Sequence, residues 1–239
     1  MFSTSPCGVC GKQQATPSPS GRTDVLHKRL WRLWMNAVAD SRLTGIYAIL
    51  GHEGALERLD ACLEVGIRVV QYRGKAAATL EMARALAQRC RSAGALLIVN
   101  DDLELALAAG AGGLHLGQED AGGADLAAVR RRLGPAILGL STHDAEQARR
   151  AAELGADYVG AGCVFPTRSK ERVIEIGVEG LRRIVAASPL PVVAIGGIDA
   201  NNVREVRASG AAMAAVIGAI AGAPDARAAV RALTDAWDG

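Results

Sequence analysis

The sequence has few aromatic residues, little net charge and no long apolar run. Phe, Trp and Tyr make up 3% of its 239 residues, which suits helices packed closely on a sheet better than a β-sandwich. The formal net charge of +2 does not predict binding to nucleic acid or to a membrane surface. No run of about 18 apolar residues and no apolar signal-peptide core occur. We therefore expect a soluble cytoplasmic protein.

Cysteines are too few and too scattered for a disulfide framework. Their number is odd, and they lie at Cys7, Cys10, Cys62, Cys90 and Cys163. The first two have half of a zinc-ribbon spacing, but no second CxxC or HxxxH follows, and a structural zinc ion needs four ligands. This distribution favours a reducing compartment.

Signatures of two enzyme classes are also missing. The first predicted strand leads into "GIYAILGHEGALERL" (45–59), which lacks the GxGxxG of an open dinucleotide-binding sheet. No obvious Ser–His–Asp or Cys–His set is present, so the sequence does not predict a protein nucleophile.

Short apolar runs alternate with Ala-, Leu- and Arg-rich helical runs, such as 80–94, 144–155 and 200–210. Several helical runs end on a glycine just before the next strand: Gly66, Gly94, Gly155 and Gly210. We expect strands at 45–50, 67–72, 95–100, 113–117, 136–141, 157–162, 191–197 and 214–220. This repeated order predicts an α/β fold, a closed (β/α)8 TIM barrel over residues 41–239.

Residues 1–40 form an extension with a different composition. The first 22 or so are rich in Ser, Pro, Gly and Thr and are expected to be disordered. Residues 24–43 carry apolar side chains at helical spacing with Lys and Arg between them, which predicts an amphipathic helix. That helix could cover one end of the barrel, lie on a membrane surface or bind a partner.

Polar residues gather where the predicted strands end, and the opposite ends are mostly Gly, Ala and Pro. In a TIM barrel the chemistry lies at the carboxyl ends of the strands. The polar groups there include Gln71, Arg73, Lys75, Asn100, Asp101, Asp102, His115, Gln118, Glu119, Asp120, Ser141, Thr142 and His143. This asymmetry predicts an active site at that end of the barrel.

The residue types at this end are those that bind phosphate and magnesium. Arg73, Lys75 and Lys170 are cations that can grip a phosphate. Asp101 and Asp120 follow adjacent strands, and two carboxylates with phosphate oxygens are how proteins usually hold Mg²⁺. We therefore expect a magnesium-assisted site for a phosphorylated substrate.

A second phosphate site is expected on the far strands. The pair Gly196–Gly197 and the segment "VIGAI" (216–220) allow backbone N–H groups to face an anion. Thr167 and Ser169 add hydroxyl groups on a loop that begins at Pro166. Together the two sites predict a protein that binds two phosphorylated groups.

Simpler roles remain open for several of these residues. Either Asp101 or Asp102 could cap the helix that follows, and we expect Asp102 to do so. A lone histidine in an apolar strand, His115, is more often a hydrogen-bonded core residue. Tyr72 fits a packing role by pattern, and Arg168 could be a solvated loop charge.

The motifs and their order resemble the thiamine phosphate synthase family. The resemblance covers about residue 44 to the end, through "VVQYRGK", "IVNDDLELALAAGAGGLHLGQED", "LGLSTHD", "GADYVGAGCVFPTRSK" and "VVAIGGI". It implies that 4-amino-2-methyl-5-hydroxymethylpyrimidine diphosphate is coupled to 4-methyl-5-(2-phosphoethyl)thiazole, giving thiamine phosphate and pyrophosphate. The pyrophosphate would leave first, and the thiazole nitrogen would attack the resulting pyrimidine cation.

The resemblance also implies roles for individual residues. The pyrimidine diphosphate would be bound by Gln71, Tyr72, Arg73, Gly74, Lys75, Asn100, Ser141 and Lys170. The thiazole phosphate would be bound by Thr167, Arg168, Ser169, Gly197, Ile217 and Gly218. Asp101 and Asp120 would hold Mg²⁺, and the groups that act in catalysis would be Arg73, Lys75, Ser141 and Lys170.

The sequence departs from the family pattern at two site positions. Ser169 stands where the family has Thr, which keeps the hydroxyl, and Gly218 stands where the family often has Ser, which removes one side-chain hydrogen bond. Two alternatives remain: a thiazole tautomerase-like barrel, with His143 as the acid–base group, and a non-catalytic phosphate-binding barrel. The oligomeric state is open, a homo-oligomer included.

Overall fold

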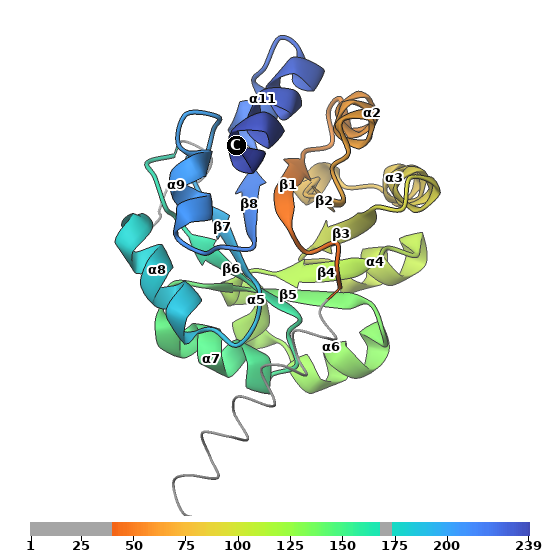
Figure 1. Cartoon of the computed structure of the whole chain (residues 1–239). Coiled ribbons are helices and arrows are strands. Elements are labelled where there is room, and N and C mark those ends of the chain that lie inside the picture. The colour runs from red at the N-terminus through yellow and green to blue at the C-terminus, as the bar shows by residue number, and fades with distance from the viewer. Residues whose placement is uncertain (1–39, 168–173) are drawn as a thin grey trace, which may run out of the picture. The chain divides into compact units, whose positions relative to one another are not determined.

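The computed structural model describes residues 40–167 and 174–239, which form a closed barrel of eight parallel strands (Figure 1). Each strand pairs with the next in chain order, and the last pairs with the first. The strands are β1 (Gly45–Leu50), β2 (Val69–Tyr72), β3 (Leu96–Asn100), β4 (Gly113–Leu116), β5 (Ile137–Thr142), β6 (Tyr158–Gly162), β7 (Val192–Ile195) and β8 (Met213–Val216). The predicted (β/α)8 fold is confirmed. The predicted extension lies outside the described residues up to residue 39.

Helices cover the outside of the barrel, and local signals fix where they begin. They are α2 (Ala55–Val65), η1 (Lys75–Ala77), α3 (Leu80–Ser92), α4 (Leu103–Ala109), α5 (Gln118–Gly123), α6 (Leu126–Leu133), α7 (Ala145–Glu153), α8 (Gly177–Ala187), α9 (Val203–Ala208), α10 (Gly218–Ala221) and α11 (Ala226–Asp238). An Asp or Thr side chain caps many of them by accepting a hydrogen bond from the N–H three residues on: Thr79, Asp102, Asp125, Asp144 and Asp225.

Most predicted strand boundaries differ from the structure by one to three residues, and two differences are larger. The expected last strand, 214–220, is a strand only to Val216, and Gly218 to Ala221 form α10. A short apolar run does not distinguish a buried strand from a buried helix, which explains this error. The expected helix 24–43 also runs too far, because residues 41–44 form turns and bends. The glycines expected at helix ends do have positive φ, between 67° and 98°, at Gly66, Gly94, Gly155 and Gly210.

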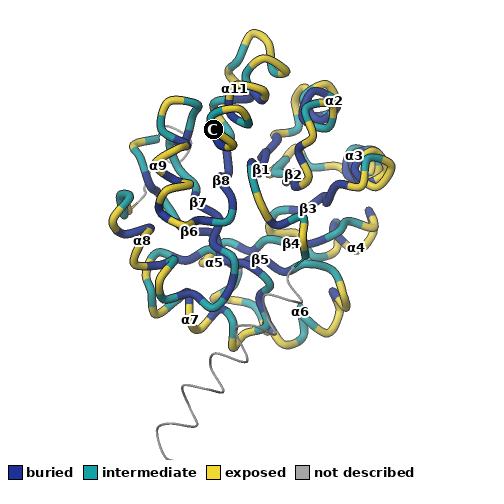
Figure 2. The backbone as a smooth tube through the Cα atoms, in the orientation of Figure 1, coloured by how far each residue is buried: buried dark blue, intermediate teal, exposed yellow. Residues whose placement is uncertain are grey.

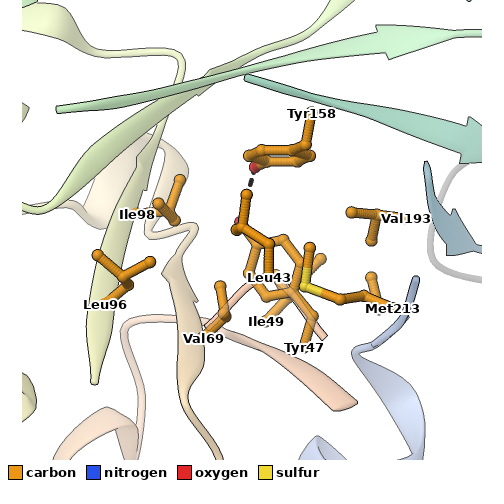
Figure 3. Packing of buried hydrophobic residues seen from close by; sticks show 10 residues of the cluster. Leu43, Tyr47, Ile49, Val69, Leu96, Ile98, Tyr158, Val193 and Met213 are labelled. Atoms are coloured by element: carbon orange, nitrogen blue, oxygen red, sulfur yellow. Dashed lines mark hydrogen bonds between the residues drawn. The ribbon is translucent and has the colours of Figure 1, made fainter. Parts of the chain in front are cut away.

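Side chains fill the barrel interior, and those toward the amino-terminal ends of the strands are mostly apolar. Strands are buried almost throughout, and exposed residues lie on the outer helix faces and loops (Figure 2). The buried cluster inside the barrel comes from alternate strand positions, as pleated strands require: Tyr47, Ile49, Val69, Leu96, Ile98, Tyr158, Val193, Met213 and Ala215, with Leu43 below (Figure 3). The next inward positions on β2, β4 and β5 are the polar residues Gln71, His115 and Ser141, which belong to the floor of the site.

No helix in the described ranges is long and apolar enough to cross a membrane. Three described cysteines, Cys62, Cys90 and Cys163, are buried and free. Burial raises the pKa of the Cys62 and Cys90 thiols to about 12, so they behave as packing groups.

Gly139 makes room for the Tyr158 side chain, and its replacement tests that packing. A Cβ at Gly139 would lie 2.1 Å from the Tyr158 ring. We expect Gly139→Ala to lower the free energy of unfolding by about 3 kcal/mol, measured by urea denaturation. Gly51→Ala is the control, because a Cβ there meets nothing within 4 Å. Equal stability of the two variants would contradict this packing.

Candidate active site

A cleft of about 570 Å³ opens at the carboxyl ends of β2 and β3. Its walls bring together residues that the sequence predicted for a phosphorylated substrate: Tyr72, Arg73, Gly74, Lys75, Asn100 and Asp101. The strand register brings these residues together. Tyr72 pairs with Val99 and Asn100 pairs with His115, so the segments that follow β2 and β3 begin at about the same height along the barrel axis. The two cations thus share a single opening with Asp101, and the acids Asp102 and Glu104 also line it.

Unusual backbone conformations occur in the cleft. Among the described non-glycine residues, those with positive φ are Lys75, at 49°, and Asp101, at 62°, and both line the cleft. Such conformations cost free energy and are found most often where function requires them. Gly74 between the strand and Lys75 is required by close packing, since a Cβ there would lie 2.8 Å from the Tyr72 hydroxyl and from Ala78 Cα.

Hydrogen bonds hold Asp101 in place. Its backbone N–H donates to His115 O at 2.8 Å, and its Oδ1 accepts from the Gly117 N–H at 2.9 Å. The Asn100 side-chain amide donates to its Oδ2. Asp102 has a different role, because its Oδ1 accepts from the Leu105 N–H at 2.8 Å and caps α4. The prediction that Asp102 caps the following helix is therefore confirmed.

The residues present fit a magnesium ion bound together with a phosphate. Asp101 is exposed in the cleft, and its carboxylate oxygens keep lone pairs besides those used in its hydrogen bonds. Within the described part of the chain, no three His, Cys, Asp or Glu side chains form a metal-binding group. Mg²⁺ needs only one or two carboxylates when phosphate and water supply the other ligands. Asp120, the other predicted ligand, lies in α5. The structure does not describe its side chain.

The floor beside the cleft is a chain of neutral polar groups. Gln71 Nε2 donates to the Tyr47 hydroxyl at 3.0 Å, and that hydroxyl lies 3.0 Å from the Tyr158 hydroxyl (Figure 3). His115 Nδ1 lies 2.9 Å from the Tyr158 hydroxyl, and His115 Nε2 lies 3.0 Å from Ser141 Oγ. The prediction that His115 is a hydrogen-bonded interior residue is confirmed.

Burial controls the ionisation of this floor. Burial, with the nearby Arg73 guanidinium as the smaller cause, lowers the pKa of His115 to about 4. Burial also raises the pKa of the Tyr47 and Tyr158 hydroxyls above their usual value. All three side chains are therefore neutral near pH 7, and the charges of the site lie on the cleft above them.

The segment after β6 is hydrogen-bonded to the end of β7, where the sequence predicted a second phosphate site. Val164 N donates to Ile195 O and Phe165 N donates to Gly196 O, each at 3.0 Å. These bonds hold the loop close to the turn at Gly196–Gly197, which the sequence predicted to bind phosphate. A Cβ at Gly197 would lie 2.4 Å from Pro166 O. The loop leads directly to Thr167, so the structure places Thr167 near the turn that contains Gly197.

The predicted residues Ile217 and Gly218 lie where β8 passes into α10. Ile217 precedes the helix, and Gly218 is its first residue. A Cβ at Gly218 would meet nothing within 4 Å, so packing does not require glycine there. The predicted residues Arg168, Ser169 and Lys170 lie outside the described residues.

Some residues of the site were not found by sequence reasoning. Tyr47 and Tyr158 join the two halves of the floor, and Asn202 Nδ2 donates to Gly197 O at 2.9 Å, which fixes the phosphate turn. Tyr72, expected at the substrate, lines the cleft, and its hydroxyl contacts His52 Nδ1 at 2.7 Å and the Thr79 N–H at 3.3 Å. The alternation of side chains along a strand could have identified both tyrosines, because Tyr47 and Tyr158 occupy inward-facing positions of their strands, as Gln71 and Ser141 do.

Fold and site together define a TIM barrel with a charged cleft at the carboxyl ends of its strands, beside a neutral polar floor. The family described as "Thiamine monophosphate synthase" matches residues 42–220, and the chain belongs to this family. It is 43% identical over 203 residues to a "Thiamine-phosphate synthase" of Geobacillus thermodenitrificans, covering 80% of this chain and 90% of that one.

Two further relatives agree with this family. A solved structure, "Thiamine phosphate pyrophosphorylase from Pyrococcus furiosus", is 38% identical with a TM-score of 0.74, and covers 82% of this chain and 96% of its own. The "Thiamine biosynthesis bifunctional protein ThiM/ThiE" of Symbiobacterium thermophilum is 46% identical over 200 residues. That match covers 82% of this chain but only 41% of the longer bifunctional protein.

The low pKa of His115 predicts a stability that depends on pH. In the unfolded chain the histidine titrates near its ordinary value of 6.5, whereas in the folded state it titrates at about 4. Between these values only the unfolded state binds the proton, so stability is highest above pH 6.5 and falls as the pH drops toward 4. The loss on going to about pH 5 is ~2 kcal/mol, measured by urea unfolding. His115→Gln should lack this part of the loss, and an unchanged pH dependence in the variant would contradict the assignment.

Proposed function

We propose that the chain couples 4-amino-2-methyl-5-hydroxymethylpyrimidine diphosphate to 4-methyl-5-(2-phosphoethyl)thiazole and releases thiamine phosphate and pyrophosphate. The observation that carries this proposal is the cleft in which Arg73, Lys75 and Asp101 lie together, next to the floor that ends at Ser141. Family membership supports the proposal, because the relatives are thiamine-phosphate synthases by name. The protein would work in the cytoplasm, where its buried thiols stay reduced.

In this proposal, the cleft binds the diphosphate and the floor binds the pyrimidine ring. Arg73 and Lys75 are cations at its wall, and Asn100 supplies an amide. Gln71 and Ser141 lie at the two ends of the neutral floor, where they can hydrogen-bond the ring. Charge on the wall and neutrality on the floor match a ligand with an anionic tail and an uncharged ring.

Loss of pyrophosphate is the step that this arrangement assists. The carbon–oxygen bond to the diphosphate breaks, negative charge accumulates on the leaving group, and positive charge spreads into the aminopyrimidine. Arg73, Lys75 and Lys170 stabilise the leaving group by fixed positive charge, which is most effective where water is excluded. The thiazole nitrogen then forms the new bond to the exocyclic carbon, so no protein nucleophile is needed.

Magnesium fits this proposal as a bound cation at Asp101, with Asp120 as its second carboxylate. When bound, Mg²⁺ would neutralise charge on the pyrophosphate. Asp101 is suited to hold it because hydrogen bonds from Asn100 and Gly117 orient the carboxylate in the cleft.

The thiazole phosphate would be bound on the opposite side of the opening. Gly197 allows the loop at Pro166 to approach closely, and Asn202 holds the Gly197 carbonyl. Thr167, Arg168 and Ser169 follow on that loop, and the backbone at Ile217 and Gly218 completes the proposed phosphate site. Loop residues 163–175 would also keep water from the pyrimidine cation.

A coupled assay tests this function against its two alternatives. Purified protein with Mg²⁺ and both substrates should release pyrophosphate and form thiamine phosphate in equal amounts. A tautomerase would isomerise the thiazole phosphate without releasing pyrophosphate, and a binding protein would change neither substrate. Absence of thiamine phosphate at saturating substrate concentrations would refute the proposal.

A matched pair of variants tests the magnesium assignment. Asp101→Asn keeps the shape and tolerates positive φ but removes the charge, so we expect turnover to fall at least ~100-fold and the half-saturating Mg²⁺ concentration to rise. Asp102→Asn is the control, because Asn caps a helix about as well as Asp. Steady-state kinetics over a magnesium series measures both variants. Wild-type magnesium dependence in Asp101→Asn would show that this carboxylate does not bind the metal.

A further inference from the structure

The floor of the site is one continuous hydrogen-bonded chain that crosses the barrel from β2 to β5. It runs from Gln71 through Tyr47, Tyr158 and His115 to Ser141, with each link between 2.9 and 3.0 Å. The links join β2, β1, β6, β4 and β5, so the chain connects residues on strands that are not neighbours in the barrel. Its two ends, Gln71 and Ser141, are the residues that the proposed function assigns to the pyrimidine.

The order of donors and acceptors in this chain follows from the orientation of the Gln71 amide. Gln71 Nε2 donates to Tyr47, and among the described residues the other partner of the Tyr47 hydroxyl is Tyr158. Tyr47 is buried, so its hydroxyl hydrogen must be given to Tyr158. The Tyr158 hydrogen then goes to His115 Nδ1, and neutral His115 carries its own hydrogen on Nε2 and donates it to Ser141. With Gln71 Nε2 as the donor of the first link, every other order leaves a buried hydroxyl hydrogen without an acceptor.

We propose that Tyr47, Tyr158 and His115 are positioning residues that couple Gln71 to Ser141, so that one end presents an acceptor when the other presents a donor. In the order of donors and acceptors given above, Gln71 Oε1 can accept a hydrogen bond from a ligand and the Ser141 hydroxyl can donate one. Reversing one end requires rotating the Gln71 amide and every hydrogen along the chain together. The inference rests on the proposed function, since it concerns how the same site recognises its pyrimidine.

This polarity matches the edge of a 4-aminopyrimidine. The exocyclic amino group donates and needs an acceptor such as Gln71 Oε1, and the neighbouring ring nitrogen accepts and needs a donor such as the Ser141 hydroxyl. A 4-oxopyrimidine has the opposite pattern, a carbonyl acceptor beside a ring N–H donor. A coupled chain would mismatch the oxo ring at both ends, which makes these interior residues determinants of specificity.

Packing holds the coupling residues in place. The His115 and Tyr158 rings are stacked with centroids 5.5 Å apart, and the Tyr47 and Tyr158 rings meet edge to face at 6.1 Å. Glycines make this possible, because a Cβ at Gly139 would enter the Tyr158 ring and one at Gly160 would lie 3.2 Å from His115 Cε1. The rings therefore have little freedom to rotate, and only the hydrogen positions can change.

Ligand discrimination by variants of the full chain tests the coupling. Calorimetry with Mg²⁺ and no thiazole measures the dissociation constants of the aminopyrimidine diphosphate and of its 4-oxo analogue. We expect the wild type to prefer the amino ligand by ~100-fold, because both ends are mismatched by the oxo ring. Tyr158→Phe cuts the chain at its centre, so each end can adapt separately, and the preference should fall to ~10-fold or less. Tyr47→Phe cuts the preceding link and should act in the same way.

Thr142→Val is the matched control. Thr142 is a buried hydroxyl beside Ser141, but it donates to Gly160 O at 3.1 Å and is not part of the chain. Its loss should leave the ratio of the two dissociation constants at the wild-type value. General loosening of the barrel would weaken both ligands alike and would not change the ratio, and thermal unfolding identifies which variants are folded.

The outcomes distinguish failure of the coupling from failure of the proposed function. If the wild type discriminates and a folded Tyr158→Phe or Tyr47→Phe variant keeps the same ratio, the coupling is wrong while the function stands. A wild type that prefers the oxo ligand, or binds both equally, overturns the polarity. A wild type that binds neither diphosphate refutes the proposed function, and the inference with it.

Discussion

The hydrogen bond between the Tyr47 and Tyr158 hydroxyls, 3.0 Å long, joins β1 to β6 across the barrel interior. Below it lie apolar side chains such as Val69 and Met213, and beside it begins the polar floor. The protein has three tyrosines, and two of them form this bond. A tyrosine ring packs with the apolar layer while its hydroxyl requires a polar partner, so this pair makes the transition from core to site. The positions of Gln71 and His115 depend on it, because both bond to these hydroxyls.

Local patterns in the sequence were sufficient to predict the barrel and much of its rim. Alternating strands and helices, with glycines at helix ends, give the order of elements, and parallel strands bring their carboxyl ends to one side. The different positions of Asp101 and Asp102 relative to the strand end also predict that Asp102 is the cap. The Tyr47–Tyr158 contact was not predicted, since it joins residues 111 positions apart and no local pattern specifies it. Positive φ at Lys75 and Asp101 was not predicted either, because tertiary contacts impose it.

Charged and neutral groups are separated in this site for a physical reason. Arg73, Lys75 and Asp101 lie on a cleft that water can enter, where charges are solvated until a ligand arrives. The groups of the floor are more enclosed, and there burial disfavours the charged form of His115. A cationic histidine at the floor would oppose positive charge that develops on a bound pyrimidine. In the proposed function, a neutral floor would let the ring become positive while the cleft would stabilise the departing anion.

The glycines of the site differ in what they require. Gly139 and Gly197 have neighbours where a Cβ would lie, so glycine is needed there for Tyr158 and for the loop at Pro166. Gly218 has open space around its Cβ position, so its lack of a side chain has no structural cause. A Cβ at that position would meet no other atom within 4 Å. The departure from the family pattern at Gly218 therefore removes one contact to the proposed thiazole phosphate and leaves the barrel, the cleft and the floor unchanged.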